Sequence, residues 1–549
     1  MKKIVIIVAL VCGAWQQADA QYVSKVWVPD QKDGTYINPI IHADYSDPDV
    51  CAVGDDFYMT ASSFGCTPGL PILHSKDLVN WRLANYALKE IEPTIFFNAP
   101  QHGKGVWAPS IRYHNGEFFI YWGDPDWGIF MVKTKDPLGE WEKPVLVKAG
   151  KGMIDPTPLW DEDGKVYLVH AWAGSRAAFN SVITVCEMNA EGTKVISEPV
   201  LVFDGNDGVN HTIEGPKFYK RNGYYYILAP AGGVVTGWQL ALRSRNVYGP
   251  YESKIVMAQG DTDINGPHQG GWVETCTGES WFINFQDKTM YGRVLHLNPV
   301  KWENDWPVIG EDKDGDGCGE PVKRYKKPDV GRIYPIETPI ESDEFNTRQL
   351  GLQWEWHANY QDTFGFTSDL GYIRIYGHIL SKDFVNFWEV PNLLLQKFPA
   401  EEFTATAKLK VSAKADGQQS GLIVMGWDYG YLGVVKEGDK FILNQVVCKD
   451  AEQRSPETVT HLAELPVSRR FGAGLYPNYE RDIYLQVKVT GGGICYFSYS
   501  LDGRKYTLAG VPFTARQGKW IGAKVGLFST APYGKERGWV DADWFRIDK

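Results

Sequence analysis

Long apolar runs are missing from most of this 549-residue sequence. Residues 4–11 form one near the start, but a helix that spans a bilayer needs about 20 residues. Lys2 and Lys3 precede that run, and Ala-Asp-Ala ends at position 20. This is the pattern of a signal peptide over residues 1–20. It predicts export to the periplasm or the exterior, without a transmembrane anchor.

The sequence also has no surplus of positive charge. Lys and Arg together number 56 and Asp and Glu number 67, which gives a net charge of -11. Proteins that bind a phosphate backbone usually carry a basic surplus on the binding face. We therefore expect no nucleic-acid partner.

Cysteine is scarce, with eight residues and no C-x-x-C pair or zinc-like spacing. Loss of the signal peptide would leave seven, an odd number that cannot all pair internally. Cys51 and Cys66 could form a bridge, but buried free thiols are the preferred interpretation. Cys12 lies near the position of a lipoprotein cysteine, although Val11 before it fits that signal poorly.

Turn-forming and aromatic residues are abundant instead. The chain has 57 Gly, 31 Pro, 21 Trp, 29 Tyr and 25 Phe. This composition favours an all-β protein with many turns over a helical bundle, a coiled coil or a disordered chain.

One pattern recurs five times in the first 300 residues. A short apolar strand is followed by a polar turn and then by a strand rich in aromatic residues. The copies begin at Asp47, Ala108, Asp155, Glu214 and Val273. One hairpin per unit, with about 47–61 residues between units, is typical of propeller blades, and a β-sandwich with similar hairpins is the alternative. We predict a five-bladed β-propeller over residues 37–321, after an N-terminal extension over 21–36.

The character of the sequence changes after the propeller. Residues 322–340 carry basic side chains and three prolines, which indicates an ordered linker with little regular structure. Strand-like segments separated by glycine and charged turns follow to the end of the chain. They predict a jelly-roll-like β-sandwich over residues 341–549.

Three of the five repeats begin with an acid: Asp47, Asp155 and Glu214. The innermost strands of a propeller line its central channel, so equivalent positions in different blades converge on the axis. A turn cap is the alternative for an Asp, but it suits Glu214 poorly. Because a buried acid is costly unless it is paired or used, we expect the three carboxylates to share one site.

Clustered carboxylates among aromatic residues suggest glycoside hydrolysis. One carboxylate is needed as a base for water and one protonated carboxyl as an acid for the leaving oxygen. Mutual repulsion raises the pKa of the acid, and a third carboxylate can tune it.

Several segments carry a family resemblance. They include YINPIIHADYSDPDVCAVGDDFYMTASSF (36–64), VWAPSIRYHNGEFFIYW (106–122), IEGPKFYKRNGYYYI (213–227) and WVDADWFRI (539–547). In this order they resemble glycoside hydrolase family 43, in its β-xylosidase and α-L-arabinofuranosidase members that have a C-terminal β-sandwich. The resemblance implies a five-bladed propeller and an inverting mechanism. It implies that Asp47 is the general base, that Glu214 is the general acid, and that Asp155 modulates the pKa of the acid and orients it.

The resemblance implies further roles near the sugar. Arg293 would lie near the sugar hydroxyls and the acids, and His268 near the channel axis, where it contacts the substrate region or, in some members, an ion through water. Trp107 and Phe64 are candidates for contact with the sugar. An exposed arginine, a buried histidine and core aromatic residues are the ordinary alternatives.

An acidic turn follows the fifth repeat. Asp312, Asp314 and Asp316 alternate as they do at the start of a calcium loop, but Lys323 stands where an EF-hand has its bidentate Glu. A solvated turn is the preferred interpretation, and a structural calcium is the alternative. We expect no required cofactor.

The expected function is exo-acting, inverting release of terminal α-L-arabinofuranosyl residues. The partners are arabinose- or xylose-containing plant cell-wall polysaccharides and oligosaccharides. A β-xylosidase is the first alternative, and an endo-arabinanase is less favoured, because the family's sandwich often closes one side of the site. A non-catalytic carbohydrate-binding propeller would lack one or more of the acids that are present here.

Overall fold

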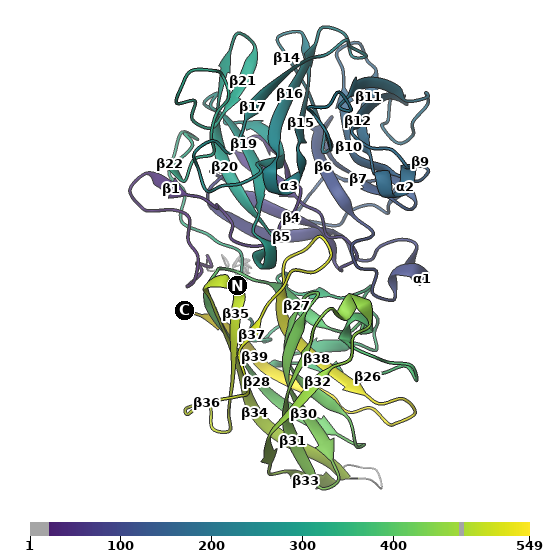
Figure 1. The fold of residues 1–549 in the computed structure, drawn as a ribbon, viewed down its shortest axis with the longest axis vertical. Coiled ribbons are helices and arrows are strands. Elements are labelled where there is room, and N and C mark those ends of the chain that lie inside the picture. The colour runs from purple at the N-terminus through teal and green to yellow at the C-terminus, as the bar shows by residue number, and fades with distance from the viewer. Residues whose placement is uncertain (1–20, 472–476) are drawn as a thin grey trace, which may run out of the picture.

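The computed structural model describes residues 21–471 and 477–549 in two β-rich bodies (Figure 1). The predicted signal peptide and Cys12 lie outside these residues. The upper body in Figure 1 is a five-bladed β-propeller and the lower one is a β-sandwich, so the predicted fold class is confirmed. Among the described residues, no helix has the length and apolar character needed to cross a membrane.

Each propeller blade is a four-stranded antiparallel sheet with its strands in chain order. The first blade comprises β2 (Asp49–Val53), β3 (Asp56–Thr60), β4 (Gly69–Ser75) and β5 (Trp81–Leu88). The second comprises β6 (Trp107–His114), β7 (Glu117–Asp124), β8 (Gly128–Thr134) and β9 (Val145–Ala149). The third comprises β10 (Met153–Trp160), β11 (Val166–Trp172), β12 (Val182–Met188) and β13 (Val200–Asp204). The fourth comprises β14 (Lys217–Arg221), β15 (Tyr224–Ala231), β16 (Trp238–Ser244) and β17 (Glu252–Met257). The fifth comprises β18 (His268–Glu274), β19 (Ser280–Asp287), β20 (Arg293–Glu303) and β21 (Trp306–Ile309).

The repeated hairpins join the first two strands of the blades. Asn115 and Gly116 have φ of 48° and 84°, and Asn222 and Gly223 have φ of 52° and 73°. Two successive residues with positive φ make the tight turn whose twist matches that of the flanking strands. The turn chemistry in the sequence therefore explains why β6–β7 and β14–β15 pair in register.

Short helical turns lie between the strands. They are α1 (Thr94–Phe97), α2 (Gly174–Ala177), α3 (Gly233–Thr236), η1 (Thr289–Tyr291), η2 (Phe387–Glu389), η3 (Ala451–Gln453) and η4 (Gly491–Gly493).

The sandwich stacks two sheets over one buried core. One sheet has the order β23 (Glu355–Trp356), β27 (Leu394–Lys397), β38 (Lys524–Ala531), β29 (Gln419–Met425), β30 (Tyr429–Glu437), β31 (Lys440–Cys448) and β32 (Thr458–Leu465), with β26 (His378–Ile379) beside β38. The other has β24 (Gly365–Ser368), β25 (Tyr372–Tyr376), β39 (Trp539–Asp548), β28 (Phe403–Ala413), β34 (Pro477–Thr490), β35 (Ile494–Ser500) and β36 (Thr507–Leu508), with β33 (Ser468–Phe471) beside β34 and β37 (Phe513–Thr514) beside β35. Leu422 and Leu527 of the first sheet and Leu409 and Val487 of the second belong to one buried cluster.

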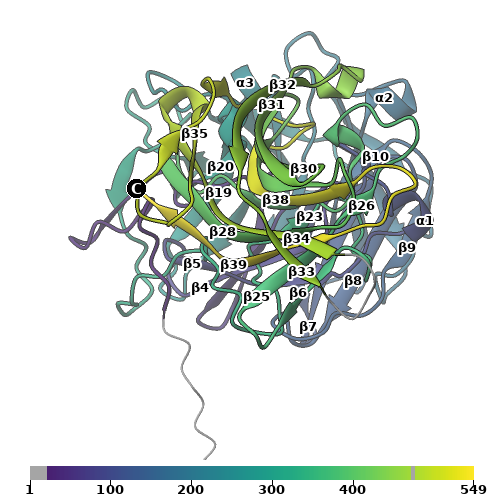
Figure 2. The same ribbon diagram turned by 90° about the horizontal axis from the view of Figure 1, so that it is seen from below.

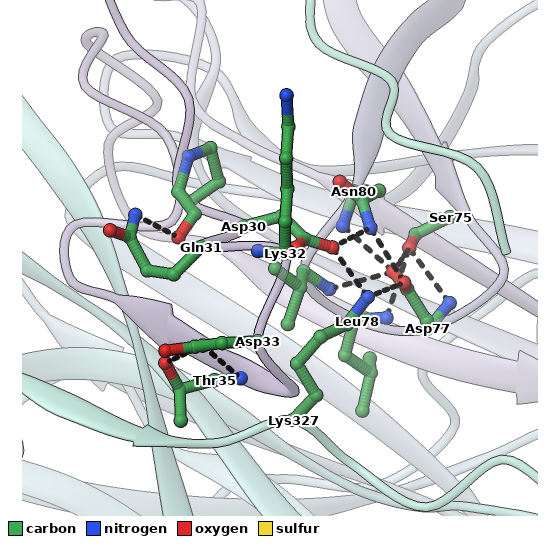
Figure 3. Close-up of polar contacts among 12 residues, drawn as sticks. Asp30, Gln31, Lys32, Asp33, Thr35, Ser75, Asp77, Leu78, Asn80 and Lys327 are labelled. Atoms are coloured by element: carbon green, nitrogen blue, oxygen red, sulfur yellow. Dashed lines mark hydrogen bonds and ion pairs between the residues drawn. The ribbon is translucent and has the colours of Figure 1, made fainter. Parts of the chain in front are cut away.

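The N-terminal extension and the linker pair with each other. Strand β1 (Thr35–Ile37) forms a two-stranded sheet with β22 (Arg324–Lys326). Next to it, the Lys327 ammonium lies 2.6 Å from Asp30 and 2.9 Å from Asp77, and the Asn80 amide donates to Asp30 over 3.0 Å (Figure 3). The extension, the first blade and the linker are therefore joined by one buried polar cluster.

The sandwich packs directly against the propeller (Figure 1) and lies in front of it when seen from below (Figure 2). Thr67 and Trp356 form a two-way backbone bridge, with N–O distances of 3.2 and 2.6 Å. The Asn359 side chain exchanges hydrogen bonds of 2.8 and 2.9 Å with the backbone of Ile91. These contacts fix the sandwich on the side of the propeller that carries the first blade.

All seven cysteines in the described part of the chain are free. Cys51 and Cys66 form no bridge, as the interpretation of free thiols requires. The expected burial holds for four of the seven, but Cys51 and Cys318 are half-buried and Cys276 is exposed.

Candidate active site

The same backbone kink recurs in or just before the innermost strand of each blade. The residue with positive φ there is Asp47 (55°), Ala108 (32°), Asp155 (58°), Gly215 (59°) or Gln269 (32°). Proline follows four of them, at positions 48, 109, 156 and 216. Such backbone costs about 1–3 kcal/mol for a residue other than glycine and is typical of functional sites. The kink therefore repeats where the three acids of the sequence pattern are found.

Asp47 is a buried carboxylate that receives three hydrogen-bond donors. Its Oδ2 accepts from the hydroxyls of Ser46 and Ser62, each at 2.6 Å. The Arg293 guanidinium donates to Oδ1 over 3.2 Å. These donors fix the orientation of the carboxylate.

The carboxylate of Asp155 contacts the backbone next to Glu214. The N–H of Gly215, the residue after Glu214, donates to Asp155 Oδ2 over 2.7 Å. Burial raises the pKa of Asp155 to about 7, and the charge of Asp47 adds to that rise while the Gly215 N–H opposes it. The hydrogen bond to the Gly215 N–H therefore holds the carboxylate of Asp155 next to the backbone of Glu214.

Glu214 is the acid that reaches solvent. Its side chain is 34% exposed, whereas the side chain of Asp47 is 6% exposed. Partial burial raises the pKa of Glu214 to about 8, the charges of Asp155 and Asp47 add to the rise, and Arg293 opposes it. At neutral pH, Glu214 is a protonated carboxyl close to two other acids.

Arg293 and His268 both contact this cluster. Arg293 is 8% exposed, and in addition to Asp47 it donates to the Ser46 hydroxyl over 2.7 Å. His268 Nε2 lies 3.5 Å from Glu214 Oε1. Burial, followed by the charge of Arg293, lowers the pKa of His268 to about 3, so the ring is neutral. Neither of its nitrogens forms a hydrogen bond within the described residues.

Phe64 and Trp107, the two candidates for contact with the sugar, lie side by side at the site. The ring centroids of Phe64 and Trp107 are 6.5 Å apart. Phe64 is 4% exposed, so most of its ring is covered by protein. Trp107 is partly exposed, and its indole N–H donates to Gly103 O over 3.0 Å. Trp107 therefore has the better-placed ring of the two for stacking on a sugar.

A third aromatic residue, Trp520, comes from the sandwich and was not predicted from the sequence. Its ring centroid is 6.3 Å from that of Trp107 and 6.0 Å from the guanidinium carbon of Arg293. The side chain is 46% exposed. It lies in the segment between β37 and β38, where the sequence has no pattern that marks it. The only signal was the general expectation that the sandwich closes one side of the site.

The acidic turn has the predicted residues close together. Carboxylate oxygens of Asp312, Asp314 and Asp316 all lie within 4.8 Å of one another. The two oxygens of Asp312 already accept the N–H groups of Gly315 and Gly317, at 2.8 and 3.0 Å. These hydrogen bonds form a tight turn, and whether the turn also holds a calcium ion stays a prediction.

The five-bladed fold and this acid cluster match known proteins. Residues 36–307 match the family model for glycosyl hydrolases family 43, and residues 342–548 match the beta xylosidase C-terminal concanavalin A-like domain. The chain belongs to glycoside hydrolase family 43. The family suggested by the sequence is thus confirmed, and so is the sandwich that follows the propeller.

Relatives within the family carry two kinds of name. A protein of Xylanibacter ruminicola, provisionally named a beta-xylosidase, is 37% identical over 91% of this chain and 87% of its own. A beta-xylosidase of Formosa agariphila is 33% identical over 94% and 91% of the two chains. The non-reducing end alpha-L-arabinofuranosidase BoGH43B of Bacteroides ovatus is 31% identical over 76% and 79%.

A solved structure of similar architecture covers both bodies. The GH43 BlXynB protein of Bacillus licheniformis superposes with a TM-score of 0.77 at 26% identity, over 94% of this chain and 99% of its own. The propeller and the sandwich are therefore arranged alike in the two proteins.

Proposed function

We propose that this family 43 glycoside hydrolase removes single terminal pentose residues from plant cell-wall saccharides with inversion of configuration. The observation that carries the proposal is the contrast between two acids in one site. Asp47 accepts three hydrogen bonds, whereas Glu214 is held protonated at neutral pH and reaches solvent. A base and an acid with different environments are what an inverting glycosidase needs.

The proposed mechanism is a single displacement. Asp47 takes a proton from a water molecule, which attacks the anomeric carbon. Glu214 protonates the glycosidic oxygen on the opposite face of the sugar as that bond breaks. Inversion requires about 6.5–9.5 Å between the two carboxyl groups, which leaves room for the water. Asp155 keeps Glu214 protonated and oriented, through its charge and the hydrogen bond from Gly215.

The position of the sandwich supports release of a terminal sugar. Trp520 of the sandwich lies next to Trp107 and Arg293 of the propeller, so the second body closes one side of the site. A closed side favours a chain end over the middle of a polymer.

The signal peptide predicted over residues 1–20 fits an exported enzyme that meets such saccharides outside the cytoplasm.

The two candidate sugars have different support. The relatives at 37% and 33% identity carry β-xylosidase names, which favours a β-D-xyloside. BoGH43B, at 31% identity, carries the name of an α-L-arabinofuranosidase, the activity that the sequence analysis placed first. We propose the xyloside as the leading substrate and retain the arabinofuranoside as the second candidate.

The test compares para-nitrophenyl β-D-xyloside with para-nitrophenyl α-L-arabinofuranoside by kcat/KM. A preference of tenfold or more for either one assigns the sugar. The same assay on Asp47→Asn should show kcat reduced by about two to four orders of magnitude, because a general base contributes that much. Circular dichroism should show the wild-type fold. Wild-type activity in a folded Asp47→Asn variant would refute the role of Asp47.

A further inference from the structure

A buried carboxylate outside the acid cluster, Asp44, lies where the two bodies meet. It is 5% exposed. Its Oδ1 accepts the backbone N–H of Arg293 over 2.8 Å, and its Oδ2 accepts the backbone N–H of Gly522 over 2.9 Å. Arg293 begins β20 of the propeller, and Gly522 precedes β38 of the sandwich. One side chain therefore joins the two bodies through backbone donors.

The backbones around Asp44 are in close contact. A Cβ on Gly292 would lie 2.5 Å from the Cβ of Asp44. A Cβ on Gly522 would lie 2.7 Å from the backbone nitrogen of Gly292. These distances are too short for a side chain, so both positions need glycine. The backbones at this junction are close-packed, so a small displacement of Asp44 must also displace the residues that contact it.

The two donors to Asp44 differ in how firmly they are held. Arg293 pairs with Asp287 in the β19–β20 ladder, which fixes its backbone within the blade. Gly522 lies in an irregular segment, where the neighbouring N–H of Ala523 donates to Met290 O over 2.8 Å. Asp44 is therefore held in place by the Arg293 N–H of the propeller. Through the Gly522 N–H, it can in turn hold the irregular segment before β38.

That segment carries the aromatic residue of the sandwich that reaches the site. Trp520 is two residues before Gly522 and has a φ of 64°, a strained conformation for tryptophan. Strained backbone persists only where its surroundings impose it. The hydrogen bond between Asp44 and Gly522 is one of these constraints.

We propose that Asp44 is a positioning residue that places Trp520 against Trp107 and Arg293, and so sets how tightly the terminal sugar is bound. This inference rests on the proposed function. We place Asp44 outside the bond-breaking steps, because its carboxylate is buried at the junction between the two bodies and binds backbone donors there. Its effect should therefore appear in KM and leave kcat nearly unchanged.

Asp44→Asn is the substitution that isolates this role. It keeps the size of the side chain, but it replaces one acceptor oxygen with an NH₂ group that faces a backbone N–H. One of the two hydrogen bonds must be lost, and the irregular segment is the part that can move. Asp44→Ser is the second variant if Asp44→Asn does not fold.

A matched control is available in the sandwich. Asp343 also accepts N–H donors, from Phe345 over 2.8 Å, from the Trp354 indole over 2.9 Å and from the Gln353 amide over 3.4 Å. Among the described residues, these donors all lie within residues 345–354, away from the segment that carries Trp520. Asp343→Asn should lower the Tm and leave KM within twofold of wild type.

The experiment is a double-mutant cycle on the preferred para-nitrophenyl pentoside. We expect Asp44→Asn to raise KM at least fivefold with kcat within twofold. In a Trp520→Ala background, the same substitution should change KM less than twofold, because the side chain that it positions is absent. A fivefold effect in both backgrounds, or no effect in either, would overturn the proposal.

Hydrogen–deuterium exchange separates this inference from the proposed function. Asp44→Asn should speed exchange in the peptide that covers residues 516–523, whether or not the enzyme cleaves the test glycosides. If the wild type cleaves neither glycoside, the proposed function is wrong, while the exchange data still test the anchor. Unchanged exchange in a folded Asp44→Asn variant would contradict the positioning role directly.

Discussion

Replacing Asp155 with asparagine should move the alkaline limb of the pH–rate profile to lower pH. The general acid must be protonated to work, so activity is lost as pH rises through the pKa of Glu214. After burial, the charge of Asp155 is the largest cause that raises that pKa to about 8. Asparagine has the same shape and can still accept the hydrogen bond from Gly215, but it carries no charge.

The size of the shift follows from the protonated fraction of Glu214. At a pKa of about 8, roughly 90% of the carboxyl is protonated at pH 7, whereas at the ordinary value of 4.5 the fraction would be about 0.3%. A nearby charge shifts a pKa by about 1–3 units. Loss of one unit would reduce the protonated fraction at pH 8 from about one half to about one tenth. We therefore expect kcat/KM at pH 8, relative to pH 6, to fall about fivefold more than in the wild type.

The assay measures kcat/KM from pH 5 to 9 on an unactivated disaccharide of the preferred pentose, whose leaving group needs the proton. Asp155 itself has a pKa of about 7, so the asparagine changes the local charge mainly above that pH. Asp314→Asn, in the exposed acidic turn, is the control and should keep the wild-type profile. An alkaline limb that stays in place, or moves to higher pH, in Asp155→Asn would refute the coupling between the two acids.

Two further predictions test the acid and the junction between the bodies. Glu214→Gln should lower kcat by about two to four orders of magnitude on the disaccharide, but much less on a para-nitrophenyl glycoside, because nitrophenolate leaves without a proton; equal losses would contradict its role. Glu355→Gln should cost about 3–5 kcal/mol of unfolding free energy in denaturant titrations, since half-buried Lys397 and buried Lys524 both contact that carboxylate. Glu140→Gln, at an exposed pair, should change stability little, and similar losses in both variants would refute the reasoning.

Patterns that lie within one blade could be predicted from the sequence. The Asn115-Gly116 turn requires positive φ at two successive positions, and this requirement is visible in the residue types alone. The acids at 47, 155 and 214 stand at matching places in their repeats. Because the propeller brings equivalent positions together, local spacing was enough to predict that they meet.

Contacts between the bodies could not be predicted in this way. Asp44 and Gly522 are 478 positions apart, and their hydrogen bond depends on how the sandwich docks on the propeller. Trp520 lies in an irregular segment without periodicity, so nothing local separates it from the other tryptophans. The sequence also left Phe64 and Trp107 equal as sugar contacts, and only the burial of Phe64 separates them.

The central claim, that Asp47 activates water for direct displacement while Glu214 protonates the leaving oxygen, is tested most directly by the stereochemistry of the product. Proton NMR would follow the first minutes of hydrolysis of para-nitrophenyl β-D-xyloside, before mutarotation mixes the anomers. The mechanism predicts that α-xylose appears first and that β-xylose follows only by mutarotation. Initial release of β-xylose would show retention, and it would contradict the assignment of Asp47 as a base for water.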